Sequence, residues 1–161
     1  MEKEKNAELI HLDMQYWGLY HWPNGKHIGA FLKELKENAK IYTGKCPNCG
    51  RFFCPPLPMC GRCHVKIEEQ HKWIEVGPKG TLFNFTVIEQ QFLHPQTGQM
   101  LEVPFPVGLI NLDGAPTSFF HRLEETDSSK LHVGMRVKAI FRPKSERRGD
   151  ISDIRFFRTV E

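Results

Sequence analysis

Apolar residues recur with the period of a helix near the start of the chain. Five of them are separated by intervals of three and four positions: Ile28, Phe31, Leu32, Leu35 and Ala39. Because about 3.6 residues complete one helical turn, this spacing predicts an amphipathic helix. The earlier stretch 7–20 is also rich in large apolar residues, and we expect a second helix there. A turn at 21–25 would join the two into a helical hairpin over residues 1–42.

This hairpin carries more large apolar side chains than two short helices can bury against each other. Two explanations are open: the helices pack on the rest of the same chain, or they form a docking surface for a partner subunit. The second explanation makes the large aromatic and aliphatic side chains candidate anchors. The candidates are Tyr16, Trp17, Leu19 and Trp22.

The second half of the chain has the pattern of β-strands. Residues 81–88 alternate and are rich in β-branched and aromatic side chains, and we expect Phe83 and Phe85 to share the face that points into the core. Four further segments have strand character: 107–112, 117–123, 135–141 and 151–160. Five short strands with an irregular linker at 127–133, after the third, are the order of an OB-fold barrel.

Residues 43–73 show neither the helical spacing of apolar residues nor the alternation of strands, yet they contain all five cysteines of the chain. They cannot build a conventional apolar core, so another kind of bond must hold them. We therefore expect three parts along the chain: a helical hairpin at 1–42, a metal-held ribbon at 43–73 and a barrel at 74–161.

The composition is that of an ordinary soluble domain. The chain has 161 residues, of which 40% are hydrophobic and 25% charged, with a net charge of +3. No apolar run approaches the ~20 residues that a membrane span needs. The first residues lack the basic and apolar pattern of a signal peptide. We expect a cytoplasmic protein with no membrane association, in which cysteines act as metal ligands or thiols rather than disulfides.

The four cysteines of two Cys-x-x-Cys pairs are the strongest chemical signal. Ten residues separate the pairs: Cys46, Cys49, Cys60 and Cys63. Two such turns aim four sulfurs at one point, which suits a closed structural zinc site. Iron uses the same four-sulfur geometry, and paired disulfides or a redox Cys-x-x-Cys are the remaining alternatives. Gly50 and Gly61 are expected where the backbone turns tightly around the metal.

The fifth cysteine, Cys54, lies between the two pairs. It is either a small buried apolar residue or a reactive thiol. No histidine or helix N-terminus flanks it in the sequence to lower its pKa, which favours the inert interpretation.

An ordered set of motifs over nearly the whole chain resembles one protein family. The set comprises an amphipathic helix, a Cys-x-x-Cys-Gly knuckle, an aromatic Pro-Pro segment, a second knuckle, a Trp and a Gly-Thr-x-x-x-Phe-Thr strand. In this chain these motifs are 31–36, 46–50, 53–56, 60–63, Trp73 and 80–86. They are similar to those of the zinc-ribbon and OB-fold proteins that accompany thiolases and thiolase-like acyl-CoA enzymes.

The resemblance implies a mainly β protein with a helical hairpin, a rubredoxin-like zinc ribbon and a five-stranded OB-fold barrel. It implies that the four paired cysteines bind one structural zinc. It also implies a non-catalytic accessory subunit that a thiolase-like catalytic partner requires for assembly or activity, near a bound acyl-CoA. Family members often have an arginine after Pro-Pro, where this chain has Leu57, so we expect no anion contact from that position.

A basic cluster near the C-terminus offers candidate contacts to CoA or another anion, because guanidinium groups suit phosphates. Its members are Arg142, Lys144, Arg147 and Arg148. The alternative function is binding of single-stranded nucleic acid, in which an OB barrel stacks bases on exposed aromatic rings. Four residues are candidates for such stacking: Phe83, Phe85, Phe119 and Phe120. A third interpretation makes these residues ordinary core aromatics beside a solvated basic loop.

The sequence contains no recognisable P-loop, dinucleotide motif or nucleophile elbow. His94 and His121 lie in or beside the predicted barrel, with no partner base that spacing identifies. We therefore expect the chain alone to have no catalytic activity, the chemistry belonging to its partner.

Overall fold

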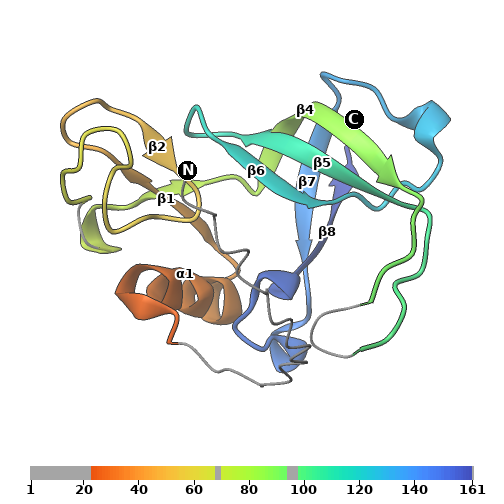
Figure 1. The fold of residues 1–161 in the computed structure, drawn as a ribbon, viewed down its shortest axis with the longest axis horizontal. Helices are drawn as coiled ribbons and strands as arrows, with labels where there is room; N and C mark the ends of the chain where they lie inside the picture. Colours follow the sequence, from red (N-terminus) through yellow and green to blue (C-terminus); the bar gives the residue numbers. More distant parts are fainter. Residues whose placement is uncertain (1–22, 68–69, 94–97, 161) are drawn as a thin grey trace, which may run out of the picture.

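The computed structural model describes residues 23–67, 70–93 and 98–160. One α-helix is described, with two β-sheets beside and above it (Figure 1). The helix and strands are α1 (Gly25–Asn38), β1 (Ile41–Lys45), β2 (Phe52–Phe53), β3 (Ile74–Val76), β4 (Lys79–Ile88), β5 (Phe105–Leu112), β6 (Ser118–Arg122), β7 (Arg136–Phe141) and β8 (Ile154–Thr159). Four short 3-10 turns complete the described elements: η1 (Gln70–Lys72), η2 (Ser128–Lys130), η3 (Lys144–Glu146) and η4 (Ile151–Asp153).

The helix α1 forms where the apolar spacing predicts it. Phe31 and Leu35 lie on its inner face and are fully buried. Ala39 follows with a left-handed backbone, and its N–H donates to the Leu35 carbonyl at 3.2 Å, which closes the last turn. The predicted first helix lies outside the described residues, so the helical hairpin remains a prediction. The candidate docking residues lie outside them too: Tyr16, Trp17, Leu19 and Trp22.

The first sheet has three antiparallel strands in the order β2-β1-β3. The central strand β1 pairs with β3 near its start, Ile41 opposite Val76, and with β2 near its end, Lys45 opposite Phe52. The buried Thr43 hydroxyl donates to the Phe53 carbonyl at 2.9 Å. This small sheet carries the cysteine turns at one end and joins the rest of the protein at the other.

The second sheet has the order β6-β5-β4-β7-β8 and folds into an OB barrel. Its strands occupy the segments with strand character, except that the last begins at Ile154 because residues 151–153 form η4. A parallel bridge between Leu123 and Phe157 brings the two outer strands together. The Glu124 N–H donates to the Phe157 carbonyl at 2.9 Å beside this bridge. The barrel is therefore closed between β6 and β8.

A β-bulge interrupts β4 and overturns one expectation. The register pairs Leu82 with Ile110 and Asn84 with Leu109, which leaves Phe83 as an extra residue. A bulge redirects the side chain of its extra residue. Leu82 is fully buried, whereas Phe83 is 57% exposed. The prediction that Phe83 faces the core together with Phe85 is therefore wrong, because strict alternation fails at the bulge.

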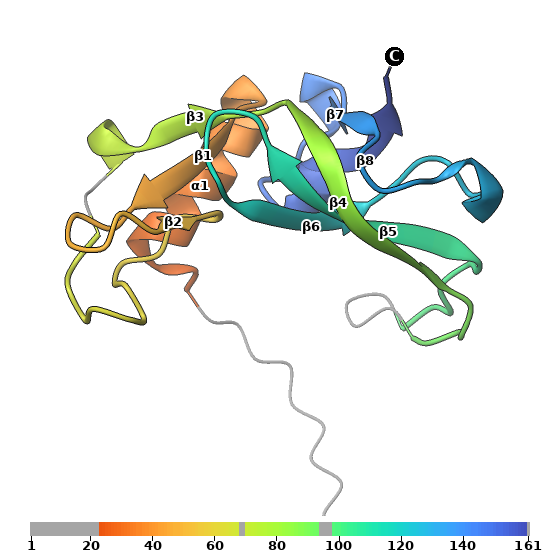
Figure 2. The same ribbon diagram turned by 90° about the horizontal axis from the view of Figure 1, so that it is seen from above.

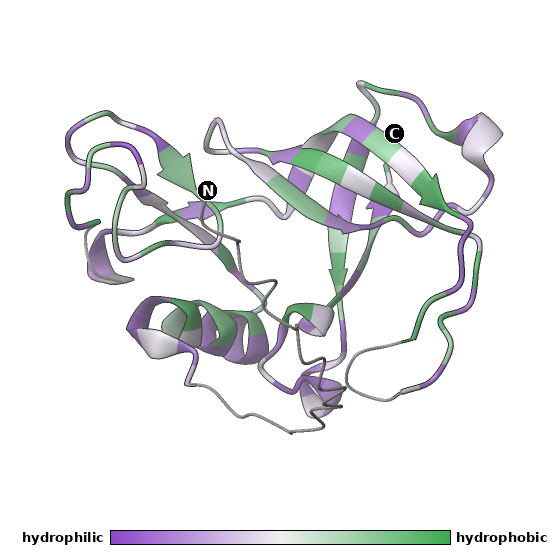
Figure 3. Ribbon diagram, viewed as in Figure 1, coloured by the Kyte–Doolittle hydropathy of each residue, from purple (hydrophilic) through white to green (hydrophobic). Residues whose placement is uncertain are grey.

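One continuous core joins α1, the base of the small sheet and the barrel. It combines Phe31 and Leu35 of α1 with Ile41 and Val76 of the small sheet, and with barrel side chains such as Phe157. Figure 3 shows hydrophobic residues on α1 and along the barrel strands, interrupted by hydrophilic ones. The core therefore fixes the base of the ribbon against the barrel.

Within the described ranges, no helix has the length and apolar character needed to cross a membrane.

Candidate metal centre

The first cysteine turn begins where β1 ends. The Cys46 N–H donates to the Arg51 carbonyl at 2.8 Å, and the Gly50 N–H donates to the Cys46 carbonyl at 3.0 Å. The Cys49 N–H also points at the Cys46 sulfur, 3.5 Å away. Gly50 has a φ of 70°, a backbone that favours glycine. Glycine is thus favoured at position 50, where the sequence predicts a tight turn.

The second turn repeats the hydrogen bonds of the first. The Cys60 N–H donates to the Val65 carbonyl at 3.0 Å, and the His64 N–H donates to the Cys60 carbonyl at 2.9 Å. His64 therefore occupies the position of Gly50, with a φ of 53°. Gly61 has no left-handed backbone, and a Cβ there would meet no atom within 4 Å. The expectation for Gly61 is wrong, because the tight turn follows the second cysteine of the pair.

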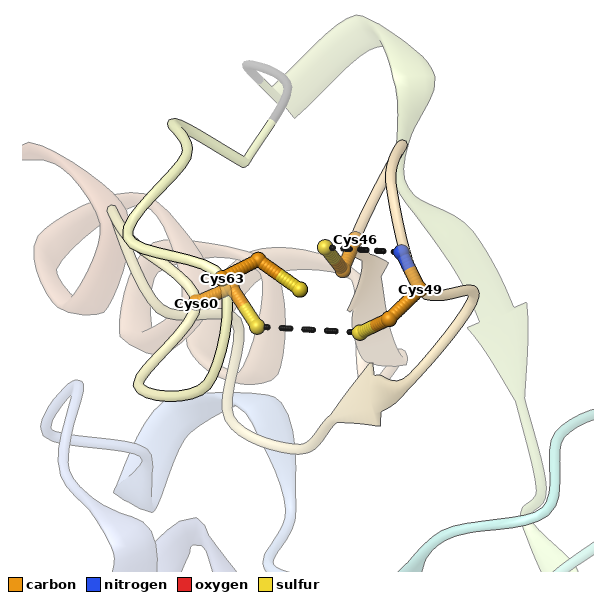
Figure 4. Close-up of side chains that lie close together, drawn as sticks. All are labelled: Cys46, Cys49, Cys60 and Cys63. Atoms are coloured by element: carbon orange, nitrogen blue, oxygen red, sulfur yellow. Dashed lines mark hydrogen bonds between the residues drawn. The ribbon is translucent and has the colours of Figure 1, made fainter.

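The four sulfurs of the two turns point toward one another (Figure 4). All four lie within 4.8 Å of each other, and the Cys49 and Cys60 sulfurs are 3.8 Å apart. A tetrahedron with zinc–sulfur arms of about 2.3 Å has edges of about 3.8 Å. Cys46 and Cys60 are buried, and Cys49 and Cys63 are half-buried. The predicted cysteine ligands therefore come together as one four-sulfur cluster positioned to bind a metal ion.

Backbone N–H groups and neighbouring sulfurs shift the pKa values of these thiols. Backbone N–H groups of the second turn, Cys63 first, lower the pKa of Cys60 to about 7. The hydrogen bond that Cys49 makes to Cys63 raises the pKa of Cys63 to about 11. The backbone N–H of Arg51 is the main cause of the lowered pKa of Cys49. Zinc binds cysteine as the thiolate, so binding of the ion would release the remaining protons of these thiols.

Little apolar surface supports this cluster. The small core around it consists of Cys46, Cys60 and Ile67, with Phe53 and Val65 packed at its edge. Two of the three buried members are thus candidate metal ligands themselves. Zinc–sulfur bonds would supply the cohesion that apolar burial does not, because structural zinc contributes its binding free energy to folding.

Cys54 does not join the cluster. It packs at the edge of the main core, and its thiol donates to the Tyr42 carbonyl at 3.5 Å. Burial raises the pKa of the Cys54 thiol to about 12. Because the thiolate is the nucleophile, this thiol is inert at neutral pH.

The basic candidate residues lie on the loop between β7 and β8, residues 142–153. The Arg147 guanidinium donates to the Arg142 carbonyl at 2.8 Å and to the Lys36 carbonyl of α1 at 3.1 Å. The Arg142 guanidinium donates to the Ser152 carbonyl at 2.8 Å. These two side chains therefore hold the loop together and tie it to the end of α1.

Asp153 organises the same loop from within, which sequence reasoning missed. Its side chain is fully buried, and its two carboxylate oxygens accept the N–H groups of Arg148 at 2.7 Å and Gly149 at 2.8 Å.

Lys144 and Arg148 have exposed side chains at the surface of this loop. An anion contact of the basic cluster remains a prediction.

The residues considered for base stacking are divided between surface and core. Phe119 is buried and Phe85 is half-buried, whereas Phe83 and Phe120 are exposed. His121 is half-buried and stacks on Phe119, with ring centroids 5.9 Å apart. His94 lies outside the described residues.

Comparison with known proteins places these two units in one family. The sequence model of the ChsH2 rubredoxin-like zinc ribbon domain matches residues 40–68, and that of the ChsH2 C-terminal OB-fold domain matches residues 73–142. The chain therefore contains a ChsH2-type zinc ribbon and a ChsH2-type OB-fold domain. The ribbon match includes the four clustered cysteines, so the ChsH2 zinc ribbon and the observed sulfur geometry agree.

One relative and two solved structures are similar to this chain. A DUF35 domain-containing scaffold protein of Methanocaldococcus jannaschii is 24% identical over 126 residues, or 78% of this chain and 84% of the relative. The Ltp2-ChsH2(DUF35) aldolase has a similar fold, with a TM-score of 0.57 at 21% identity over 86% of this chain and 98% of the other. A DUF35-family protein of unknown function from Sulfolobus solfataricus gives a TM-score of 0.51 at 24% identity over 81% of both chains.

Proposed function

We propose that this chain is a non-catalytic, zinc-binding accessory subunit of a thiolase-type acyl-CoA complex. The observation that carries the proposal is the combination of a four-sulfur ribbon and an OB barrel in one chain, both matched by ChsH2 domains. A relative that matches 78% of this chain is called a scaffold protein, and a protein of similar fold is named with Ltp2 as an aldolase. These names support a role in assembly.

The zinc of this subunit is structural in the proposal. Four cysteine sulfurs fill a tetrahedral shell, which leaves no open position for substrate or water. The remaining described cysteine, Cys54, is held protonated by burial and so supplies no nucleophile. The reactive groups of the complex therefore belong to the thiolase-like catalytic subunit.

The acyl-CoA would lie at or near the interface of the two subunits. The exposed Lys144 and Arg148 are the members of the basic cluster best placed to contact its phosphates, since the Arg142 and Arg147 guanidiniums donate to main-chain carbonyls. Among possible complexes, benzoylsuccinyl-CoA thiolase of anaerobic aromatic degradation is our candidate, on the resemblance of the motifs. The proposed location of such a complex is the cytoplasm.

Co-expression tests this function directly. The full chain and a thiolase-type catalytic subunit, with the benzoylsuccinyl-CoA thiolase subunit as the first choice, are expected to elute as one complex of fixed stoichiometry by light scattering. Thiolysis should require both chains, and the accessory chain alone should show no turnover. Turnover by the isolated chain at the rate of the complex would refute the proposal.

Binding of single-stranded nucleic acid is the second candidate, favoured by the exposed rings of Phe83 and Phe120 on the barrel. A nucleic-acid-binding protein would purify with a high 260/280 absorbance ratio, and its binding would weaken steeply with salt. Heparin chromatography and absorbance of the purified chain distinguish this candidate from the accessory subunit.

A further inference from the structure

The outer face of β4, β5 and β6 exposes the aromatic side chains of Phe83 and Phe120. Asn84 of β4, Leu109 of β5 and Phe120 of β6 lie opposite one another across the three strands. The bulge adds Phe83 beside this row, pointing away from the core. Phe83 is 57% and Phe120 64% exposed, although a barrel core is available to both strands. In Figures 1 and 2, α1 lies next to β1 at one end of the molecule and does not cover β4 and β5.

The described part of the β4–β5 loop extends this apolar surface. Phe92 packs against Phe105 of β5 with ring centroids 6.3 Å apart, and the Leu101 N–H donates to the Phe92 carbonyl at 3.0 Å. A bridge between Leu93 and Met100 continues the hairpin. Phe92, Leu93 and Met100 are 46%, 60% and 53% exposed, respectively. The described part of the loop thus packs on β5 while it presents large apolar side chains to solvent.

The exposed area is sufficient for a stable interface. A large apolar side chain presents roughly 200 Å² when fully exposed, so the two strand phenylalanines and the three loop residues together expose about 550 Å². A standard interface buries about 800 Å² on each partner, of which somewhat over half is apolar. These five side chains therefore match the apolar share of one full-sized interface.

The charges around this surface favour a protein over a nucleic acid. Arg122 lies among these side chains, with its guanidinium 4.4 Å from the centre of the Phe105 ring. Glu89 and Glu102 are exposed where the loop leaves β4 and approaches β5. The two carboxylates outweigh the one guanidinium, which disfavours a phosphate backbone, whereas a protein can place basic residues opposite the carboxylates.

We propose that the outer face of β4–β6, together with the base of the β4–β5 loop, is the docking surface for the catalytic subunit. This inference rests on the proposed function, in which the chain is an accessory subunit. Phe83 and Phe120 are the central anchors, and the catalytic subunit meets them with apolar side chains and meets Glu89 and Glu102 with basic ones.

The experiment compares the full wild-type chain with the double variant Phe83→Ser/Phe120→Ser, each mixed with the thiolase-type catalytic subunit. The matched control is Met59→Ser, which removes an apolar side chain that is 48% exposed on the ribbon. Titration calorimetry should show binding at least about a hundredfold weaker for the double variant, as for the loss of two interface hot spots. The control should bind as the wild type, and all chains should retain zinc and the same denaturation midpoint.

Any other result contradicts the proposed docking surface. Equal affinity of the double variant, or an equal loss in Met59→Ser, shows that the interface lies elsewhere while the accessory function stands. If the wild-type chain does not bind the catalytic subunit, the proposed function fails first. Light scattering and absorbance then show whether this face holds a second copy or nucleic acid, and a monomer free of nucleic acid shows that it holds neither.

Discussion

The ribbon tip and the barrel are held by different forces within one chain. The barrel surrounds a core of fully buried side chains such as Leu82, Ile110 and Phe157. The buried apolar cluster of the ribbon tip consists of Ile67 and two of the clustered cysteines. Burial of a large apolar side chain contributes ~1.5–3 kcal/mol, so the barrel can fold on apolar burial whereas the tip cannot. The comparison teaches that the loss of metal and the loss of core packing should affect different parts of the molecule.

The largest expected effect comes from Cys60→Ser, which removes one of the four sulfurs. Structural zinc contributes on the order of 10 kcal/mol or more to the folding of its site. Elemental analysis should show one zinc per wild-type chain and a large loss in the variant. Amide hydrogen exchange should show lost protection over 46–67 and retained protection in β4–β8. Cys54→Ser is the control and should keep its zinc; a matching loss there would make Cys54 a ligand.

Leu82→Ala should lower the stability of the barrel and leave the ribbon tip unchanged. Removal of this fully buried side chain leaves a cavity in the barrel, and we expect a loss of ~3 kcal/mol in the free energy of unfolding. Denaturant titration gives this value, and zinc content should stay at one per chain. A variant that loses its zinc along with its barrel stability would show that the two regions are not held independently.

Asp153→Ala tests the loop that joins the barrel to α1. The change leaves the N–H groups of Arg148 and Gly149 without their acceptor, so we expect a loss of about 1–3 kcal/mol. Denaturant titration measures the loss. Asp153→Asn keeps one acceptor oxygen and should lose less. If the alanine variant is as stable as the wild type, the carboxylate does not hold the loop.

The smallest effect concerns the two cysteine turns themselves. His64 has the left-handed backbone that glycine adopts at Gly50, and such a backbone costs a non-glycine residue roughly 1–2 kcal/mol. His64→Gly should therefore raise the stability of the zinc-loaded ribbon, by about 1 kcal/mol at most, in thermal unfolding. Gly61→Ala is the matched control and should be neutral. A loss of stability in the control would restore the sequence-based expectation for Gly61.

The sequence was sufficient for features that depend on spacing. Two Cys-x-x-Cys pairs predict four converging sulfurs because each turn has few ways to close, and the cluster is observed. The helical period from Ile28 to Ala39 likewise predicts α1, and the ChsH2 zinc ribbon and OB fold agree with the expected architecture. In each case a short local pattern determines the structure.

Features that depend on tertiary registration could not be predicted. The bulge at Phe83 arises from the pairing of β4 with β5, and nothing in the alternation of 81–88 reveals it. The buried carboxylate of Asp153 is selected by backbone N–H groups that only the folded loop brings together. His64 was missed for a different reason: its position four residues after Cys60 matches that of Gly50 after Cys46, and this equivalence was present in the sequence.

The shared core attaches the base of the ribbon to the barrel. Ile41 and Val76, at the base of the small sheet, are packed into the same core as Phe157 of the barrel, while the sulfurs lie at the far end of β1. The base of the ribbon is therefore joined to the barrel by packed side chains as well as by the chain itself. A partner that contacts both the tip and the barrel would span two regions that one core connects.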